Sequence, residues 1–186
     1  MAKAVWIHKT GGPEMLSLDE VAVAAPRAGE VVLRHTVLGL NYIDIGMREG
    51  HYPFVKVPMA LGMEAAGVVE AVGPGVDDFT AGDRVSHCMV PGAHAERYLI
   101  AADRLIRLPD EISDEIAAAA TLQGLTAEYL LHSSHALQPG ETVLVHAAAG
   151  GVGLLLCQWA KAIGATVLSL IHISEPTRPL YISYAV

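Results

Sequence analysis

The pattern of hydrophobic and polar positions differs between the two halves of the chain. Up to about residue 100, short alternating or clustered apolar runs are separated by turns rich in glycine and proline. Runs of this kind indicate β-strands, because side chains alternate between the two faces of a strand. The expected strands are Ala2–Ile7, Leu16–Ala24, Glu30–Leu40, Leu61–Val72 and Ala95–Ile100. Many short strands joined by glycine turns favour a small β-barrel or sandwich.

One short helix is predicted within this β-rich half. Asn41 is a residue type that begins helices well, and Gly50 is one that ends them. The segment Asn41–Gly50 between them is therefore expected to be helical. The following segment, His51–Pro58, contains two prolines and two aromatic residues, and is expected to be a loop.

From Ser113 onward the pattern becomes helical. Ser113 is a suitable N-cap before an acidic first turn, and the alanine run Ala117–Ala120 favours a helix. A second helix is expected over Leu125–His132, ended by Pro139 and Gly140. The change of pattern places a domain boundary near residues 112–123, which gives one domain over 1–122 and another over 123–168.

The stretch Thr142–Lys161 reads as a valine-rich strand, a glycine turn and an amphipathic helix. This is the order of a dinucleotide-binding βα unit, in which the N–H groups at the helix start bind phosphate. The turn reads Ala148-x-Gly150-x-x-Gly153, and a methyl group at Ala148 is tolerable if φ stays negative there. Apolar residues surround most of the helix, which predicts that it is largely buried. The glycine pattern by itself leaves open a strand-turn-helix that binds nothing. A second strand is expected at Thr166–Leu168.

Composition and charge narrow the class of protein. The chain has 186 residues, of which 52% are hydrophobic and 17% charged, with a net charge of −8. This indicates a globular protein with a large core and disfavours electrostatic binding of nucleic acid. The two cysteines, Cys88 and Cys157, provide neither a disulfide framework nor zinc-ligand spacing. The N-terminal residues do not resemble a secretory signal, and no apolar run reaches membrane-spanning length, so we expect a cytoplasmic protein without membrane partners.

Several motifs occur together in a characteristic order. They are Asn41-Tyr42-Ile43-Asp44, Tyr52-Pro53, Leu61-Gly62-x-Glu64-Ala65-Ala66-Gly67, Gly82-Asp83-Arg84-Val85, Gln123-Gly124-Leu125-Thr126-Ala127 and Ala148-Ala149-Gly150-Gly151-Val152-Gly153. In this order the chain resembles the zinc-independent, zeta-crystallin-like quinone oxidoreductase family of the medium-chain dehydrogenase/reductase superfamily. The resemblance covers about Met1–Val167.

The resemblance implies an α/β plus β fold. Residues 1–122 would form a GroES-like, partly open β-barrel that carries the catalytic site. Residues 123–168 would form the first βαβ of a truncated Rossmann domain that binds NAD(P). The implied parent enzyme is a homodimer, with most of its dimer contacts outside this chain.

The implied activity is metal-free hydride or electron transfer from NADPH to a quinone or another conjugated carbonyl. In zinc-dependent relatives a cysteine and a histidine hold the metal at positions occupied here by Asn41 and Met63. An amide and a thioether cannot form that site, so we expect no metal. Hydrogen bonds must then polarise the acceptor, and a quinone is electrophilic enough to need no Lewis acid.

The resemblance also assigns residues to the site. Asn41 and Tyr52 are the candidate catalytic residues, and together with Asp44 they are expected to line the substrate pocket. The implied cofactor contacts are Asn41, Tyr42, Tyr52, Thr126, Ala149, Gly150, Gly151, Val152 and Gly153. Four of these residues have a structural alternative: Asn41 as a helix cap, Asp44 as a hydrogen-bonding residue, Tyr52 as a packed aromatic and Thr126 as a capping hydroxyl.

The final segment, 169–186, does not continue the family pattern. It contains Pro176 and Pro179 and no amphipathic helix pattern. We interpret it as an anomalous tail resembling translated sequencing adapter, joined to an N-terminal fragment; natural truncation or a frameshift is the alternative. This leaves open whether the chain by itself is active.

Two further interpretations of the function stay open at this stage. The first is a zinc-free enone or enoyl-thioester reductase of the same superfamily, which also transfers hydride to a polarised double bond. The second, from a different class, is a non-catalytic dinucleotide-binding or crystallin-like protein. Comparing the turnover of a quinone with that of an enone distinguishes the enone or enoyl-thioester reductase from a quinone reductase. Binding of NADPH without turnover of either acceptor would indicate the non-catalytic protein.

Overall fold

The computed structural model describes residues 1–169, and the segment 169–186 interpreted above as anomalous lies outside them except for Ser169. The chain divides into two compact units, one formed by Met1–Leu122 and the other beginning at Gln123. Each unit has its own hydrophobic core and is described separately below.

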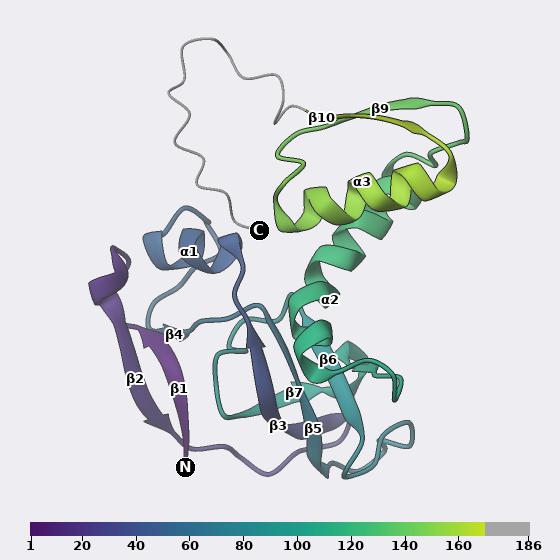
Figure 1. Cartoon of the computed structure of the whole chain (residues 1–186). Helices are drawn as coiled ribbons and strands as arrows, with labels where there is room; N and C mark the ends of the chain where they lie inside the picture. Colours follow the sequence, from purple (N-terminus) through teal and green to yellow (C-terminus); the bar gives the residue numbers. More distant parts are fainter. Residues whose placement is uncertain (170–186) are drawn as a thin grey trace. The chain divides into compact units, whose positions relative to one another are not determined.

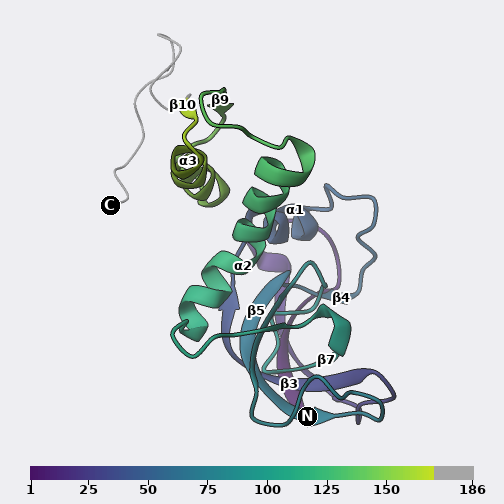
Figure 2. The same ribbon diagram turned by 90° about the vertical axis from the view of Figure 1, so that its right-hand side faces the viewer.

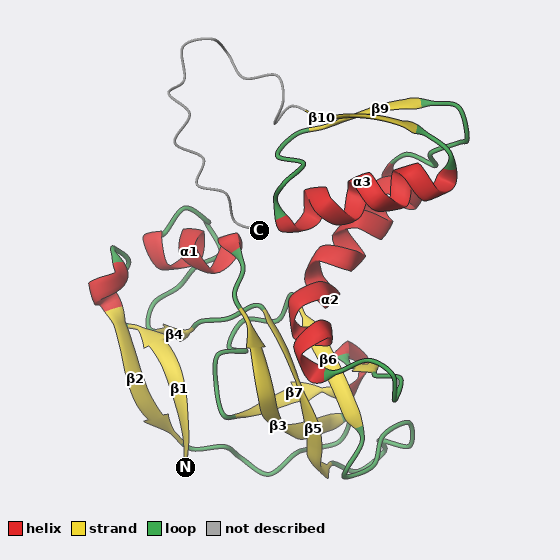
Figure 3. Ribbon diagram, in the orientation of Figure 1, coloured by secondary structure: helices red, strands yellow, loops and turns green. Residues whose placement is uncertain are grey.

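The first unit is built mainly from short strands (Figure 3). Its strands are β1 (Ala2–Ile7), β2 (Leu16–Val21), β3 (Glu30–Gly39), β4 (Met59–Ala60), β5 (Glu64–Val72), β6 (Arg84–Cys88), β7 (Arg97–Ala101) and β8 (Ile106–Arg107). They form a three-stranded sheet in the order β2-β1-β4 and a five-stranded sheet in the order β7-β3-β5-β6-β8, and every pairing is antiparallel. The predicted strands are therefore confirmed, with β4, β6 and β8 in addition.

The segment before β7 joins the two sheets. The backbone N–H of Val5 in β1 donates to His94 O at 2.8 Å, and that of Glu96 donates to Lys3 O at 2.9 Å. On the other side, the N–H of His35 in β3 donates to Glu96 O at 3.0 Å. β3 also shifts register against β5 at two places, and such irregularities bend a strand. The result is the partly open β-barrel that the family resemblance implies.

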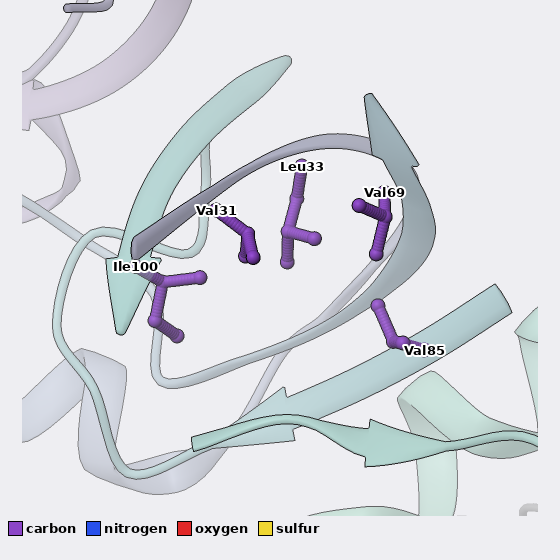
Figure 4. Close-up of a cluster of buried hydrophobic side chains, with 5 residues drawn as sticks. All are labelled: Val31, Leu33, Val69, Val85 and Ile100. Carbon is purple, nitrogen blue, oxygen red and sulfur yellow. The ribbon is translucent and has the colours of Figure 1, made fainter. Parts of the chain in front are cut away.

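The barrel core follows from the alternation along its strands. Val31 and Leu33 of β3 point to the same side as Val69 of β5, Val85 of β6 and Ile100 of β7, as Figure 4 shows. All five are at most 4% exposed. Because they come from four different strands, their burial fixes the register of the five-stranded sheet.

The rings of His35 and Tyr98 both stack on the ring of His87 in the first unit. His35 Nδ1 lies 2.7 Å from Ala95 O, which can only accept, so Nδ1 carries the proton. Desolvation lowers the pKa of both imidazoles, so His35 is neutral and its Nε2 accepts the N–H of His87 Nε2 at 3.0 Å. His87 is fully buried, and its remaining nitrogen, Nδ1, has no hydrogen-bond partner. Both imidazoles are therefore neutral in this arrangement.

Helix α1 (Tyr42–Glu49) begins and ends as the sequence predicts. Asn41 is the N-cap with extended backbone, and Gly50 closes the helix in the left-handed conformation at φ 81°. Two 3₁₀ turns, Pro13–Met15 and Ala102–Arg104, also belong to this unit.

Helix α2 (Asp114–Glu128) begins in the first unit and ends in the second. The Ile116 N–H donates to the Ser113 hydroxyl at 3.3 Å, which confirms the predicted cap. The prediction of a separate helix over Leu125–His132 is wrong, because α2 runs without interruption to Glu128 and continues as a π-helical turn, Tyr129–Ser134. Gly124 lies inside α2, where a glycine costs about 1 kcal/mol relative to alanine but does not prevent helical backbone.

The second unit contains a βαβ. Strand β9 (Thr142–Val145) leads into helix α3 (Gly151–Ile163), and β10 (Thr166–Ser169) pairs parallel to β9. α3 lies along one side of the two strands, as the two views in Figures 1 and 2 show. The prediction that α3 is largely buried is wrong: Leu154 is 52% exposed and Trp159 37%. The described part of the unit gives the helix two strands and one helical segment to pack against, so only one face is covered.

Candidate functional site

A buried polar cluster surrounds the start of α1. The Asn41 side-chain Nδ2 donates to Glu64 Oε2 at 2.7 Å, and the Asn41 backbone N–H donates to Asp44 Oδ2 at 2.8 Å. Asn41 is 8% exposed, Asp44 3% and Glu64 1%. The structure therefore brings together the predicted pair Asn41 and Asp44, and adds Glu64 to them.

Three different elements position this cluster. Asn41 follows β3, Asp44 belongs to the first turn of α1, and Glu64 is the first residue of β5. The second Glu64 oxygen, Oε1, accepts the backbone N–H of Leu122 in α2 at 2.6 Å. Gly39 leaves room for these contacts, because a Cβ there would lie 2.7 Å from Glu64 Oε2.

Burial controls the ionisation of both carboxyl groups. Desolvation raises the pKa of Glu64 above its ordinary value, against the hydrogen bonds from Asn41 and Leu122, and the neighbouring charge of Asp44 adds to the rise. Desolvation also raises the pKa of Asp44, against the hydrogen bond from Asn41 and the nearby imidazole of His94. The His94 Nε2 lies 3.9 Å from Asp44 Oδ2 and 2.9 Å from Gly39 O.

The two predicted tyrosines have different surroundings. Tyr52 is half-buried, packs against Gly46 of α1 and stacks on Phe54 with 5.3 Å between ring centroids. Tyr42 directly follows Asn41 but is 83% exposed. Tyr52 thus belongs to the packed surroundings of α1, whereas the Tyr42 ring is presented to solvent.

The glycine turn between β9 and α3 forms a compact second feature, located in the second unit. Gly150 is the N-cap of α3 with φ −76°, and no side chain caps the helix. The first N–H groups of the helix therefore have neither an intrahelical acceptor nor a side-chain cap. The methyl group of Ala148 is tolerable in this turn if φ there is not positive. This holds, because the positive φ in the turn, 48°, belongs to Ala147.

An added Cβ would make close contacts at two of the glycines. A Cβ at Gly153 would lie 2.7 Å from the Cα of Ala148, so a side chain there would push α3 away from the turn. A Cβ at Gly151 would lie 2.6 Å from the Gln123 side-chain oxygen, which places Gln123 beside the helix start. A cavity of about 490 Å³ borders the same turn and is lined mainly by apolar residues, together with His146. Val152 and Thr126 are half-buried, and Ala149 is exposed.

The donor groups do not favour a metal. Within residues 1–169, no three His, Cys, Asp or Glu side chains lie close enough to hold an ion together. Met63, which stands where zinc-dependent relatives have a histidine, is 3% exposed and packs in the core with Ile7, Met47 and Leu61. The metal-free chemistry stays a prediction based on these side-chain types. In the same part of the chain, no helix is long and apolar enough to cross a membrane.

Glu64, His94 and Gln123 were not assigned to the site from the sequence. Glu64 had a recognisable signal, because it is a single carboxylate inside the apolar stretch Leu61–Val72, where an acid must find hydrogen bonds. Gln123 begins one of the motifs listed above, but its place beside α3 depends on how the chain folds back, and His94 carries no signal in the sequence.

Comparison with known proteins gives a consistent result. Residues 27–139 match the family described as the alcohol dehydrogenase GroES-like domain. The chain is 46% identical to a quinone oxidoreductase of Pseudomonas aeruginosa, over 96% of this chain and 55% of that protein. It is 45% identical to a 2-haloacrylate reductase of a Burkholderia species, over 94% of this chain and 54% of the relative.

The fold agrees with the sequence match. The crystal structure of Escherichia coli quinone oxidoreductase complexed with NADPH matches with a TM-score of 0.87 and 46% identity, over 90% of this chain and 52% of that chain. The chain thus spans about half the length of the relatives it matches. It belongs to the alcohol dehydrogenase GroES-like domain family and, within the medium-chain dehydrogenase/reductase superfamily, to the quinone oxidoreductases, of which it covers the N-terminal part.

Proposed function

We propose that this chain is part of an NADPH-dependent reductase that transfers hydride to a quinone without a metal. The observation that carries the proposal is the uncapped, glycine-lined start of α3 at Gly150–Gly153. Membership of the quinone oxidoreductases and the NADPH complex of the E. coli relative support it. In this proposal, residues 1–122 supply the catalytic domain and residues 123–168 begin the cofactor-binding domain.

The turn fits the pyrophosphate of a dinucleotide. The N–H groups of Gly151, Val152 and Gly153 stand at the positive end of the α3 dipole, where an anion is favoured. Gly150 and Gly151 are exposed and lack side chains that would block a phosphate. Ala149 is proposed to contribute its backbone, and Thr126 its hydroxyl. NADPH, when bound, supplies the hydride.

Asn41 is suited to polarise a carbonyl oxygen of the acceptor. Its amide nitrogen carries two hydrogens, one of which is donated to Glu64, so the other can be donated to an acceptor oxygen. Tyr52 and Tyr42 remain proposed contacts of the substrate or the cofactor. Asp44 holds the Asn41 backbone and is proposed to act at the edge of the substrate pocket.

Site-resolved binding tests the cofactor proposal. NADPH added to ¹⁵N-labelled protein is expected to shift the amide resonances of Gly150, Gly151, Val152 and Gly153 in NMR spectra. Gly151→Pro removes one N–H at the first helical position, where proline is tolerated, and should weaken binding about tenfold. Gly151→Ala places the same Cβ beside Gln123 but keeps the N–H, so it is the matched control. Shifts that spare the turn, or equal affinity of the two variants, would refute a pyrophosphate site here.

A second acceptor class is favoured by one specific observation, the 45% identity to a 2-haloacrylate reductase. Such an acceptor contains a polarised double bond, as a quinone does. Steady-state NADPH oxidation with 1,4-benzoquinone, an enone and 2-chloroacrylate separates the two, because the preferred substrate has the highest kcat/KM. Binding of NADPH without turnover of any of the three would instead support a non-catalytic dinucleotide-binding protein.

Two further proposals concern the cellular location and the oligomeric state of the protein. We propose a cytoplasmic location, on the basis of the composition and the charge of −8. We also propose homodimerisation of the complete enzyme. Size-exclusion chromatography with light scattering tests the second statement, and cell fractionation tests the first.

A further inference from the structure

We propose that Glu64 is a positioning residue that sets which end of the Asn41 carboxamide is available to the acceptor. This inference rests on the proposed function for its catalytic consequence, but its structural content stands on the hydrogen bonds of the first unit. Glu64 is 1% exposed, so it cannot contact a substrate and must act through Asn41.

The Glu64 carboxylate determines the orientation of the amide. The two ends of an Asn side chain have almost the same size, so hydrogen bonds decide which end faces which neighbour. An ionised carboxylate can only accept, and its two oxygens accept from Asn41 Nδ2 at 2.7 Å and from the Leu122 N–H at 2.6 Å. The amide nitrogen of Asn41 is therefore held against Glu64, with its second hydrogen left to donate.

Helix α2 in turn holds the Glu64 carboxylate. The Leu122 N–H belongs to the helix backbone and can only donate a hydrogen bond. It therefore fixes which group donates and which accepts in the series from Leu122 through Glu64 to Asn41. Gly39 permits this approach, because a Cβ there would meet the Glu64 side chain. The order from Leu122 through Glu64 to Asn41 is thus built from three separate elements.

The cost of this arrangement argues for a purpose beyond packing. No salt bridge to a cation is present for Glu64 among the described residues, and a buried carboxylate without a cation is expensive. An apolar residue at this strand position would avoid the cost. The groups around Glu64 are Asp44 of α1, whose charge opposes its ionisation, and Cys88, opposite it on β6. His94 lies next to Asp44.

The replacement Glu64→Gln tests this role directly. It keeps the size of the side chain but replaces one accepting carboxylate oxygen by an NH₂ group that donates. The Gln oxygen must stay on the Leu122 N–H, so the Gln nitrogen faces Asn41 and the Asn41 amide has to turn its oxygen inward. The expected result is a large change in the Asn41 side-chain NH₂ resonances and loss of the hydrogen-exchange protection of one of them. Quinone-dependent kcat should fall at least tenfold, with little change in the KM for NADPH.

Glu70→Gln is the matched control. Glu70 lies on the same strand, is exposed and pairs with Arg97 at 2.6 Å, so neither the Asn41 resonances nor kcat should change. Unchanged Asn41 resonances in folded Glu64→Gln would overturn the proposal, whatever the activity. Absent quinone turnover in the unaltered protein would instead count against the proposed function, and the NMR result would still decide the role of Glu64.

A pH titration of the unaltered protein provides a second measurement that does not depend on the variant folding. Protonated Glu64 can donate, which allows the Asn41 amide to invert. The Asn41 side-chain resonances should therefore include a titration above the ordinary range of a glutamic acid that is absent from Glu64→Gln, whereas any change caused by Asp44 persists in the variant. Asn41 resonances that stay constant through the native pH range would contradict the positioning role.

Discussion

The buried pair His35 and His87 makes the first unit sensitive to acid. Desolvation lowers the pKa of His87 from 6.5 to about 3, and the neighbouring His35 adds to the decrease. Desolvation also lowers the pKa of His35, against its hydrogen bond to Ala95. The folded chain therefore resists protonation at pH values where the unfolded chain accepts protons, so stability is lost as the pH falls below 6.5.

The magnitude for His87 alone can be worked out from these values. With an unfolded pKa of 6.5 and a folded pKa of about 3, the free energy of unfolding falls by about 2 kcal/mol between pH 7.5 and pH 5. His35 acts in the same direction. Two kcal/mol is a large part of the roughly 5–15 kcal/mol that stabilises a typical domain. Glu64 and Asp44 oppose this trend, because their raised pKa values make the folded state gain protons first.

A comparison of variants isolates the histidine contribution from these opposing carboxyl groups. His87→Gln keeps an amide that can donate to His35 but cannot titrate. Urea unfolding is followed by circular dichroism and tryptophan fluorescence from pH 7.5 to pH 5. The difference in unfolding free energy between the unaltered protein and His87→Gln should change by about 2 kcal/mol over this range, in favour of the variant at low pH.

His51→Gln is the matched control, because the His51 side chain is 67% exposed and belongs to the same unit. Its unfolding curves over the same pH range provide the baseline against which the His87→Gln difference is compared. Parallel curves for His87→Gln and the unaltered protein, within about 0.5 kcal/mol, would refute the reasoning, since a buried neutral imidazole must give this slope.

Three further outcomes are expected. Gly153→Ala should lower the unfolding free energy of the second unit by roughly 2–3 kcal/mol, because its Cβ would lie 2.7 Å from the Ala148 Cα; thermal unfolding measures this. Gly124→Ala, in α2 with nothing within 4 Å of its Cβ, should instead raise stability by about 0.5–1 kcal/mol, and an equal loss in both glycine variants would contradict the packing argument. Asp114→Asn should lower the free energy of unfolding in urea by roughly 1–2 kcal/mol, because Asp114 accepts hydrogen bonds from Arg84 at 2.7 Å and from Thr36 at 2.5 Å. Asp103 is exposed, so Asp103→Asn is the control and should change the free energy of unfolding by about zero.

Local patterns in the sequence predicted most of the fold. Asn41 and Gly50 bound a helix because their side chains and backbone preferences act within one turn, and Ser113 caps α2 for the same reason. The alternating strands and the βαβ were also predicted, because periodicity and glycine turns are local properties. The separate helix over Leu125–His132 and the buried α3 were wrong, since both depend on what the rest of the chain packs against.

The candidate site was predicted in part. Asn41 and Asp44 were named from the family resemblance, whereas Gly150–Gly153 could also be named from the glycine turn before a helix, which leaves a signal in the sequence. Their roles toward a cofactor or substrate stay predictions. Glu64 could not be connected to Asn41 from the sequence, because 23 residues separate them and only the pairing of β3 with β5 places them together.

The sequence by itself determined the local elements, the family and the absence of the usual zinc-ligand side chains at Asn41 and Met63. The tertiary structure alone decided which polar groups share the protein interior. It placed the Glu64 carboxylate between Asn41 and the backbone of α2, and paired His35 with His87 at 3.0 Å. The physical reason is that hydrogen bonds between buried groups depend on the register and packing of distant strands, which no local pattern encodes.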